Sequence, residues 1–379
     1  MTLRTKTLGI IGIMLAALIG ALFATSVSVF LKGFLQVEQD DTHANILRAV
    51  AAYDEEIASL NFTSLDWASW DDTYAFIEDE NETYRTRNIS DEGIARLGLD
   101  VLVYINASGR MVFGASYDPT AAKSGPIPES LRAHLAPNAF LLQHPEPGEA
   151  RAGVLLLPEG RLLLASRPIL PSVGEGSSRG TLIMGRYLDA KRILQLESRT
   201  HMDLTFQRLD APSLATDFRI ARAKLVAGAP SLIYPLSGRT IAGYSLLRDV
   251  YGQPALLLRV ALPRDIYRQG VSTTRYQLTW LLLAAFVLGG VALLSLERMV
   301  ITRLRRLGIE VARIEKTHDL KARVSVSGDD ELGDVAAEIN RMLSKFEHTV
   351  MQHQRAVEQF AQEKTQQDAT RPASPTDSR

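Results

Sequence analysis

The segment LDWASWDDTYAFIED, residues 65–79, gathers side chains that could bind a ligand. It holds two of the chain's three tryptophans, a pair of adjacent aspartates and a tyrosine. In a helix, the aromatic rings and one carboxylate would share a face, which suits an amine or a quaternary ammonium group. Alternatively, the rings cap a hydrophobic core and a carboxylate accepts hydrogen bonds from backbone N–H groups, and we favour this structural interpretation. The candidate ligand-binding residues are Trp67, Trp70, Asp71, Asp72 and Tyr74, with Asp71 as the charge partner.

The carboxylates of the same region raise the question of a metal site. A hard cation such as calcium prefers oxygen ligands, and acidic residues cluster at 71–72 and 78–80. No loop here has a recognisable order of ligands, so we favour a solvated acidic surface. We therefore expect neither a metal site nor a cofactor.

Signatures of catalysis are missing from the sequence. It has no phosphate-binding loop, no Gly-x-Ser-x-Gly elbow and no pair of histidines at zinc-binding spacing. Because it has no cysteine, it has no disulfide and no thiolate nucleophile. His348 and His353 lie where a kinase would carry its phospho-accepting histidine, but they lack the usual His-Glu-x-x-x-Pro context. We predict that the chain is not an enzyme, and its net charge of −1 gives no reason to expect nucleic-acid binding.

Two hydrophobic runs divide the chain. Residues 8–31 and residues 278–296 contain no charged side chain, and a membrane-spanning helix needs about 20 apolar residues. The first run is longer than the roughly 7–15 residues of a signal-peptide core, which favours an uncleaved span. Basic residues precede the first run and follow the second, so the positive-inside rule places both termini in the cytoplasm. Residues 32–277 are then one extracytoplasmic domain.

The first part of that domain has helical periodicity. Apolar residues recur at steps of 4, 3, 4 and 3 along residues 46–60, which predicts a long helix leaving the membrane. The seam faces either the helix's own domain or its twin in a dimer, and the sequence does not separate these alternatives. The seam residues are Ile46, Val50, Tyr53, Ile57 and Leu60.

Strand-like runs follow from about residue 97. Two β-rich runs surround Asn106–Gly109, and two more surround Pro158–Gly160, so both pairs are predicted to be hairpins. A short helix is expected near 129–136, between the two hairpins. A third β-rich run precedes a helix that starts at Asp189. A last hairpin around Tyr251–Gly252 runs almost directly into the second span, and it could convey movement of the sheet to the membrane helix.

The cytoplasmic part contains two short heptad helices joined by a connector at 317–328. Neither helix can bury its seam alone, whereas a parallel dimer would form a four-helix coil. The seam continues to Phe360, and the polar residues 365–379 are predicted to be disordered. The two seams consist of Val300, Leu304, Leu307, Val311 and Ile314, and of Leu332, Val335, Ile339, Met342 and Phe346.

The segment 300–347 resembles a HAMP linker domain. The resemblance rests on Leu320 and Val324 in the connector and on the sequence DELG at Asp330–Gly333. One departure is Leu304, near the position where the family usually has a proline. The resemblance implies that signals are transmitted by Leu304, Leu307, Val311, Ile314, Asp330, Glu331, Gly333, Val335 and Ile339.

The W-x-x-W-D-D-x-Y core at Trp67–Tyr74, with the hairpin behind it, resembles the fourth class of CHASE domains. These are extracellular sensor modules of bacterial cyclases and histidine kinases, and the resemblance covers about residues 40–200. The resemblance implies a sensor role but names no ligand. The order of long helix, two strands, helix and three strands independently predicts an α+β fold with an antiparallel PAS- or Cache-like sheet. If a small ligand binds, we expect its site between the strands of 101–115 and 154–186, with the aromatic residues of the core at its edge or behind it.

Together these features predict a bacterial inner-membrane sensor. It would detect an unknown small extracytoplasmic ligand as a homodimer and signal in trans to a cytoplasmic kinase or cyclic-dinucleotide enzyme. The alternative is the sensor half of a diguanylate cyclase or histidine kinase whose output domain is lost or separately encoded. The expected domains are a cytoplasmic N-terminus (1–7), a span (8–31), the sensor (32–277), a span (278–296), HAMP (297–350), a coiled-coil extension (351–364) and a disordered tail (365–379).

Overall fold

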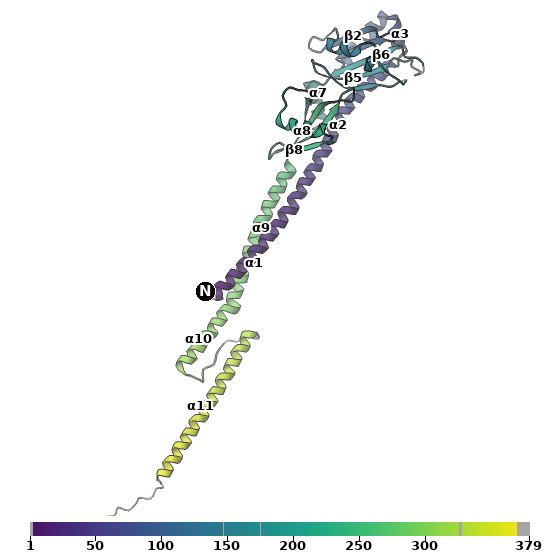
Figure 1. Cartoon of the computed structure of the whole chain (residues 1–379). Helices are drawn as coiled ribbons and strands as arrows, with labels where there is room; N and C mark the ends of the chain where they lie inside the picture. Colours follow the sequence, from purple (N-terminus) through teal and green to yellow (C-terminus); the bar gives the residue numbers. More distant parts are fainter. Residues whose placement is uncertain (1–2, 147, 175, 326–327, 370–379) are drawn as a thin grey trace, which may run out of the picture. The chain divides into compact units, whose positions relative to one another are not determined.

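The computed structural model describes residues 3–146, 148–174, 176–325 and 328–369 (Figure 1). The chain divides into two compact units. The sheet unit comprises Val29–Thr273, and the helical unit comprises Met1–Ser28 and Thr274–Arg379.

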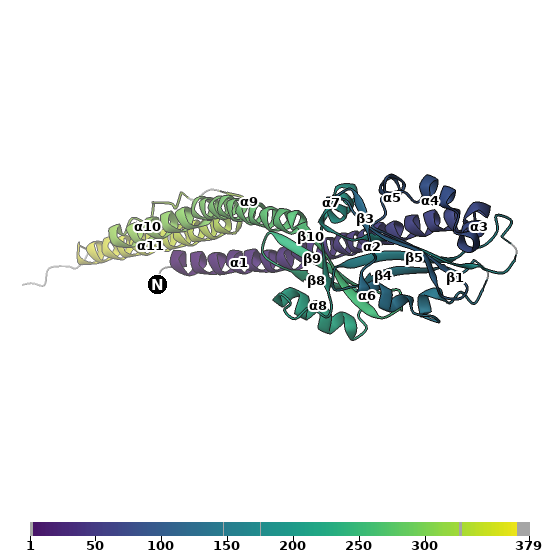
Figure 2. The same ribbon diagram turned by 90° about the horizontal axis from the view of Figure 1, so that it is seen from above.

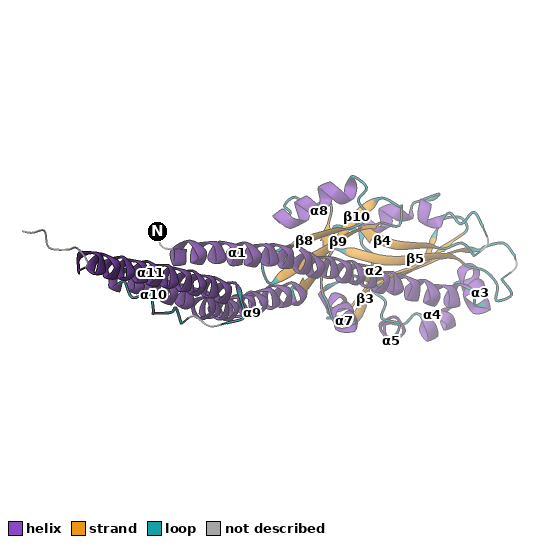
Figure 3. Cartoon of the chain, turned by 90° about the horizontal axis from the view of Figure 1, so that it is seen from below, coloured by secondary structure: helices purple, strands orange, loops and turns teal. Residues whose placement is uncertain are grey.

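The sheet unit contains two antiparallel sheets beside one long helix, α2 (Lys32–Ala68). The six-stranded sheet has the order β3-β2-β1-β6-β5-β4, and the four-stranded sheet has the order β7-β10-β9-β8. Figure 3 shows the strands in orange beside the long helix α2. The strands are β1 (Val101–Asn106), β2 (Met111–Asp118), β3 (Lys123–Gly125), β4 (Arg151–Leu156), β5 (Arg161–Pro168), β6 (Gly180–Tyr187), β7 (Asp203–Arg208), β8 (Leu232–Pro235), β9 (Thr240–Arg248) and β10 (Pro254–Pro263).

Shorter helices connect these strands and cover the sheets. After α2 come α3 (Asp71–Asp79), α4 (Glu82–Asn88) and α5 (Asp91–Arg96). The connection from β3 to β4 contains α6 (Glu129–Arg132) and the 3₁₀ turns η2 (Ala133–Leu135) and η3 (Phe140–Leu142). The four-stranded sheet is flanked by α7 (Ala190–Thr200) and α8 (Thr216–Val226).

The long helix α2 packs against both sheets (Figure 2). Ile46, Tyr53 and Leu60 are buried within the unit, so the predicted seam faces its own domain. Gly243 on β9 allows this close packing, because a Cβ there would overlap the Ile46 side chain. This finding decides between the two interpretations that the periodicity left open.

Strand alternation gives the six-stranded sheet two apolar faces. Leu102 and Tyr104 of β1 join the core cluster that contains α2 residues, whereas Val103 and Ile105 join a second cluster on the opposite face. Side chains of α6, η2 and η3 cover that second face. Val250, in the turn between β9 and β10, also joins it, and its N–H donates to the carbonyl oxygen of Val154 at 2.9 Å.

The predicted hairpins are confirmed by the pairing of β1 with β2, β4 with β5, and β9 with β10. The edge strands β3 and β8 and the helix α8 were not predicted. β3 is only three residues long, and β8 only four, so neither carries a readable alternation.

The helical unit contains α1 (Leu3–Ser26), most of α9 (Asp265–Leu296), α10 (Thr302–Thr317) and α11 (Glu331–Ala369). π-helical turns follow α1 at Val27–Leu31 and α9 at Glu297–Ile301. Two helical stretches, Gly12–Ala68 and Asp265–Thr317, are long and apolar enough to cross a membrane. Helix α11 runs to Ala369, whereas the sequence predicts a disordered tail from residue 365; residues 370–379 lie outside the described part of the chain.

Candidate functional site

The aromatic and acidic core at residues 67–74 forms a corner between two helices. Helix α2 ends at Ala68, Trp70 has extended backbone angles (φ −82°, ψ 137°), and α3 begins at Asp71. The shared face that one continuous helix would give Trp67, Trp70, Asp71 and Tyr74 does not form, because the helix breaks within the motif.

The two tryptophans nevertheless stack on each other. Their ring centroids are 5.0 Å apart, with an interplanar angle of 20°. Trp67 packs partly against the main core, whereas Trp70 remains 36% exposed. Asp72 is also exposed. The pair thus covers the end of the core without being enclosed in it.

Polar groups of the corner bind the segment between β5 and β6. The Ser172 N–H donates to Asp71 Oδ1 at 2.9 Å, and the Asp71 N–H donates to Ser172 Oγ at 3.2 Å. The Tyr74 hydroxyl donates to the carbonyl oxygen of Ser177 at 3.2 Å. The Arg179 guanidinium lies 3.9 Å from the centre of the Tyr74 ring. The Asp71 carboxylate thus accepts a hydrogen bond from a backbone N–H. Arg179 of the same chain occupies the face of the Tyr74 ring on which a cationic ligand would lie.

A buried chain of hydroxyl groups lies among the helices that follow the corner. Thr73 Oγ1 and the Tyr84 hydroxyl are 2.6 Å apart, and the Tyr84 and Tyr104 hydroxyls are 3.2 Å apart. Burial raises the pKa of Tyr84 and of Tyr104 above the ordinary value, so both hydroxyls stay protonated. Phe76 stacks on Tyr84 with ring centroids 4.5 Å apart. These contacts make the corner a fixed part of the core.

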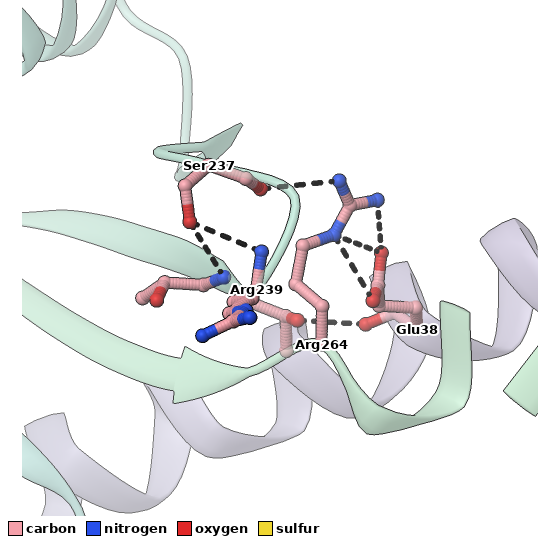
Figure 4. A network of polar contacts seen from close by, with 6 residues as sticks. Glu38, Ser237, Arg239 and Arg264 are labelled. Carbon is pink, nitrogen blue, oxygen red and sulfur yellow. Dashed lines mark hydrogen bonds and ion pairs between the residues drawn. The ribbon is translucent and has the colours of Figure 1, made fainter. Parts of the chain in front are cut away.

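A buried ion pair, which the sequence did not suggest, joins α2 to the junction between β10 and α9. Figure 4 shows the Arg264 side chain facing that of Glu38. Arg264 is 9% exposed and Glu38 is 3% exposed. Arg264 Nη2 donates to Glu38 Oε2 at 2.8 Å, and Nε lies 3.3 and 3.2 Å from the two carboxylate oxygens. The Arg264 N–H also donates to the Arg239 carbonyl oxygen at 2.9 Å. Glu38 precedes Thr42 and Asn45, two other buried residues of α2, at helical spacing. This spacing is the sequence feature that could have indicated that Glu38 is buried.

The predicted signal-transmission residues separate into two groups. Leu307 and Ile314 of α10 are buried in one apolar cluster with Val324 of the connector, and Ile339 of α11 packs against it. Leu332 is half-buried, and the remaining heptad positions of the two helices are exposed. These exposed apolar residues are Leu304, Val311, Val335, Met342 and Phe346.

Asp330 and Gly333 fix the start of α11. The Gly333 N–H donates to Asp330 Oδ1 at 3.0 Å, and Arg303 forms an ion pair with the same carboxylate, which lowers the pKa of Asp330. Gly333 is required because a Cβ there would overlap the carbonyl oxygen of Gly328. Glu331 is exposed on the first turn of the helix. Across the described ranges, no group of three or more His, Asp or Glu side chains is arranged to hold a metal ion.

Comparison with known proteins gives two family matches. The model of the CHASE4 domain matches residues 52–207, and that of the HAMP domain matches residues 296–348. A methanogenesis regulatory histidine kinase, FilI, from Methanothrix harundinacea (strain 6Ac), is 30% identical over 349 residues. That alignment covers 92% of this chain but only 38% of the kinase's length.

Solved structures with a similar course of the chain include two sensor domains. One is the extracellular domain of a protein described as a histidine kinase, vpHK1S-Z8, with a TM-score of 0.42, 14% identity and coverage of 67% of this chain and 99% of the other. The other is the periplasmic domain of Vibrio cholerae LuxQ, with a TM-score of 0.34, 13% identity and coverage of 59% and 99%. On the family matches, the chain contains a CHASE4 domain followed by a HAMP domain.

Proposed function

We propose that this protein is a membrane receptor that senses an extracytoplasmic cue in the sheet unit and passes the signal through HAMP to a cytoplasmic output. The proposal rests on the order of the elements along the chain. The last strand, β10, leads through Arg264 directly into α9, and the helical path continues through a π-helical turn into α10 of HAMP. A movement of β10 therefore has a short covalent route to the HAMP helices.

The receptor acts as a parallel homodimer in this proposal. Leu307 and Ile314 bury their side chains within one chain, whereas most of the other heptad residues of α10 and α11 leave apolar side chains in solvent. A second copy would cover these exposed side chains, as in a four-helix coil. His353, Val357 and Phe360 further along α11 are exposed as well, which extends the same surface.

The dimer is testable by cross-linking, because the chain has no cysteine of its own. Phe346→Cys in the full chain should give a disulfide-linked dimer in membranes. Val335→Lys with Met342→Lys should abolish that product, because two charges would enter the covered seam. Ala337→Lys, at an exposed position outside the seam, is the matched control and should leave cross-linking unchanged. Equal cross-linking in all variants would contradict the proposed dimer.

The output is proposed to lie in a kinase or a cyclic-dinucleotide enzyme, as a separate protein or as a separately encoded output domain. The matched domains of this chain are of sensor and linker types, and the chain spans 38% of the kinase relative that it matches. We propose that the chain itself catalyses no phosphotransfer, because His348 and His353 lack a kinase context. Labelling of either histidine by ATP in the purified chain would contradict this.

The proposed location is the inner membrane, with both termini in the cytoplasm. The two candidate spans and the basic flanks support this topology, and the domain boundaries expected from the sequence follow it. A single cysteine at Ser213 should then react with a membrane-impermeant maleimide in intact spheroplasts, whereas one at Ala337 should react only after lysis.

A further inference from the structure

A cavity of about 260 Å³ opens at one end of the six-stranded sheet, where β1 ends and β6 begins. Its walls are the turn at 107–109, the loop at 137–144 and the residues 178–181. Its size is near the lower end of the range of small-molecule sites, about 300–1,000 Å³. Only part of this site lies between the strands where the sequence placed it, since the loop at 137–144 supplies a wall that was not predicted.

His144 makes this cavity more than a surface hollow. The side chain lines the cavity, and both of its ring nitrogens are buried without a hydrogen-bond partner among the described residues. Buried polar groups in folded proteins are almost always paired. Burial lowers the pKa of His144, with a smaller contribution from Arg151 and Arg167, and the nearby backbone and carboxylate of Glu149 offset only part of this effect. The ring is therefore neutral, with one nitrogen that donates a hydrogen bond and one that accepts.

The two arginines near the cavity are already engaged by other groups of the protein. No aspartate, glutamate, lysine or arginine is among the described residues that line it. Arg151 forms an ion pair with Glu149 at 2.7 Å and stacks 4.5 Å from the Phe140 ring. Arg167 donates to the carbonyl oxygen of Gly148 at 2.8 Å. An ionic ligand would therefore find no charged side chain on the described wall of the cavity.

The lining suits a molecule whose groups both donate and accept hydrogen bonds. Ser108, Gln143 and Ser178 add hydroxyl and amide groups; each already donates one hydrogen bond within the protein, so their oxygens remain to accept. Ile105 and Leu142 are the apolar residues of the lining. We propose that this cavity binds a small uncharged compound rich in hydroxyl groups, such as a monosaccharide or a cyclic polyol, with His144 as its central hydrogen-bonding residue. The proposal rests on the proposed receptor function and names the chemistry of its cue.

One wall of the cavity has a direct contact to the output strand. Within the same connection, His134 Nδ1 lies 2.8 Å from the Tyr251 hydroxyl, and the Phe140 and Tyr251 rings are 5.3 Å apart. Tyr251 belongs to the turn between β9 and β10, and β10 leads into α9. A ligand that reorders the loop at 137–144 would therefore act on the hairpin that enters the second span.

The opposite wall is held by the aromatic corner. Ser178 and Gly180 line the cavity, and the neighbouring Ser177 and Arg179 are the residues that Tyr74 binds. The W-x-x-W-D-D-x-Y core thus supports the site from behind. In this proposal the motif contributes to sensing by supporting the cavity wall, although Arg179 already covers the Tyr74 ring.

The test is a thermal-shift assay on the full chain in nanodiscs. The probes are D-glucose, D-ribose and myo-inositol, with D-glucuronate and D-glucosamine as charged counterparts of similar size. We expect at least one neutral probe to raise the melting temperature by several degrees. His144→Asn should abolish the shift, whereas His201→Asn should keep it. His201 is an exposed residue with φ +56°, a conformation that asparagine tolerates.

A second readout does not depend on how His144→Asn folds. With the native histidine retained, Ser108→Cys places the chain's single thiol at the cavity wall, and the probe that shifts the melting temperature should slow its reaction with a maleimide at least several-fold. Ser213→Cys, away from the cavity, should react at the same rate with and without the probe. A shift retained in His144→Asn, a larger shift with a charged probe, or no shift with any neutral probe would overturn the proposal. Each of these results leaves the dimer test in HAMP untouched.

Discussion

Removing one partner of the Glu38–Arg264 pair should be among the most damaging single changes in the sheet unit. Glu38→Ala leaves the Arg264 guanidinium, 9% exposed, without its carboxylate. Breaking a buried ion pair in this way costs about 3–5 kcal/mol, a large share of the roughly 5–15 kcal/mol that stabilises a folded domain. For a unit of this size, the melting temperature should fall by about 6–20 °C.

Replacing both partners should be far less harmful. In Glu38→Leu with Arg264→Met, neither charge has to be buried, and apolar groups fill most of the same volume, so the free energy of unfolding should lie within about 1 kcal/mol of the wild type or above it. The exposed pair of Arg85 and Glu82, 3.2 Å apart, is the matched control. Glu82→Ala should cost at most about 1 kcal/mol, because surface ion pairs contribute little.

The assay is denaturant unfolding of the full chain in detergent, followed by the circular dichroism of the sheet unit. A double-mutant cycle of the wild type, Glu38→Leu, Arg264→Met and the double variant isolates the interaction between the two side chains. If Glu38→Ala costs no more than Glu82→Ala, or if the double replacement is as unstable as the single one, the ion pair does not join α2 to the start of α9 as the structure indicates.

Three further outcomes follow from local packing and burial. Trp70→Ala should cost only about 1 kcal/mol because Trp70 is 36% exposed, whereas Phe76→Ala, at a buried ring, should cost about 3–5 kcal/mol; thermal melts compare them directly. Gly333→Ala should destabilise HAMP because its Cβ overlaps a backbone carbonyl oxygen, whereas Gly308→Ala, with open space around it, should not; cross-linking on α11 reports the difference. The pKa of His144, followed by NMR, should lie below the ordinary value of about 6.5, so stability should fall as the pH drops below about 6.5, where only the unfolded chain gains the proton. An ordinary pKa would mean that the ring is solvated.

Periodic packing was the part of the structure that the sequence predicted well. Ile46, Tyr53 and Leu60 recur at helical spacing because one face of α2 packs on a sheet, and the hairpins have turn residues between runs of β-branched and aliphatic residues. The same logic located α10 and α11. It did not show whether the α2 seam was covered by the chain itself, because a period is the same for either partner.

The candidate site was harder to predict because its contacts join distant segments. The break between Ala68 and Asp71 contains no glycine or proline, so no helix-breaking residue indicated that the motif turns a corner. The pairing of Asp71 with Ser172 spans 101 positions, and no local pattern indicates it. His144 lies in a connection without periodicity, so its burial follows only from the fold.

The relay from the sheet unit to HAMP is the central claim, and inter-copy distances on α11 test it most directly. A spin label on Arg341→Cys in the full chain in nanodiscs would be measured by pulsed electron resonance in three backgrounds. Tyr251→Ala, which removes the contact between the loop at 137–144 and the β9–β10 turn, should shift the distance distribution. Tyr234→Ala, a matched change at a more exposed tyrosine on β8, should leave it as in the wild type. A dimer whose distances are identical in all three backgrounds would contradict the relay.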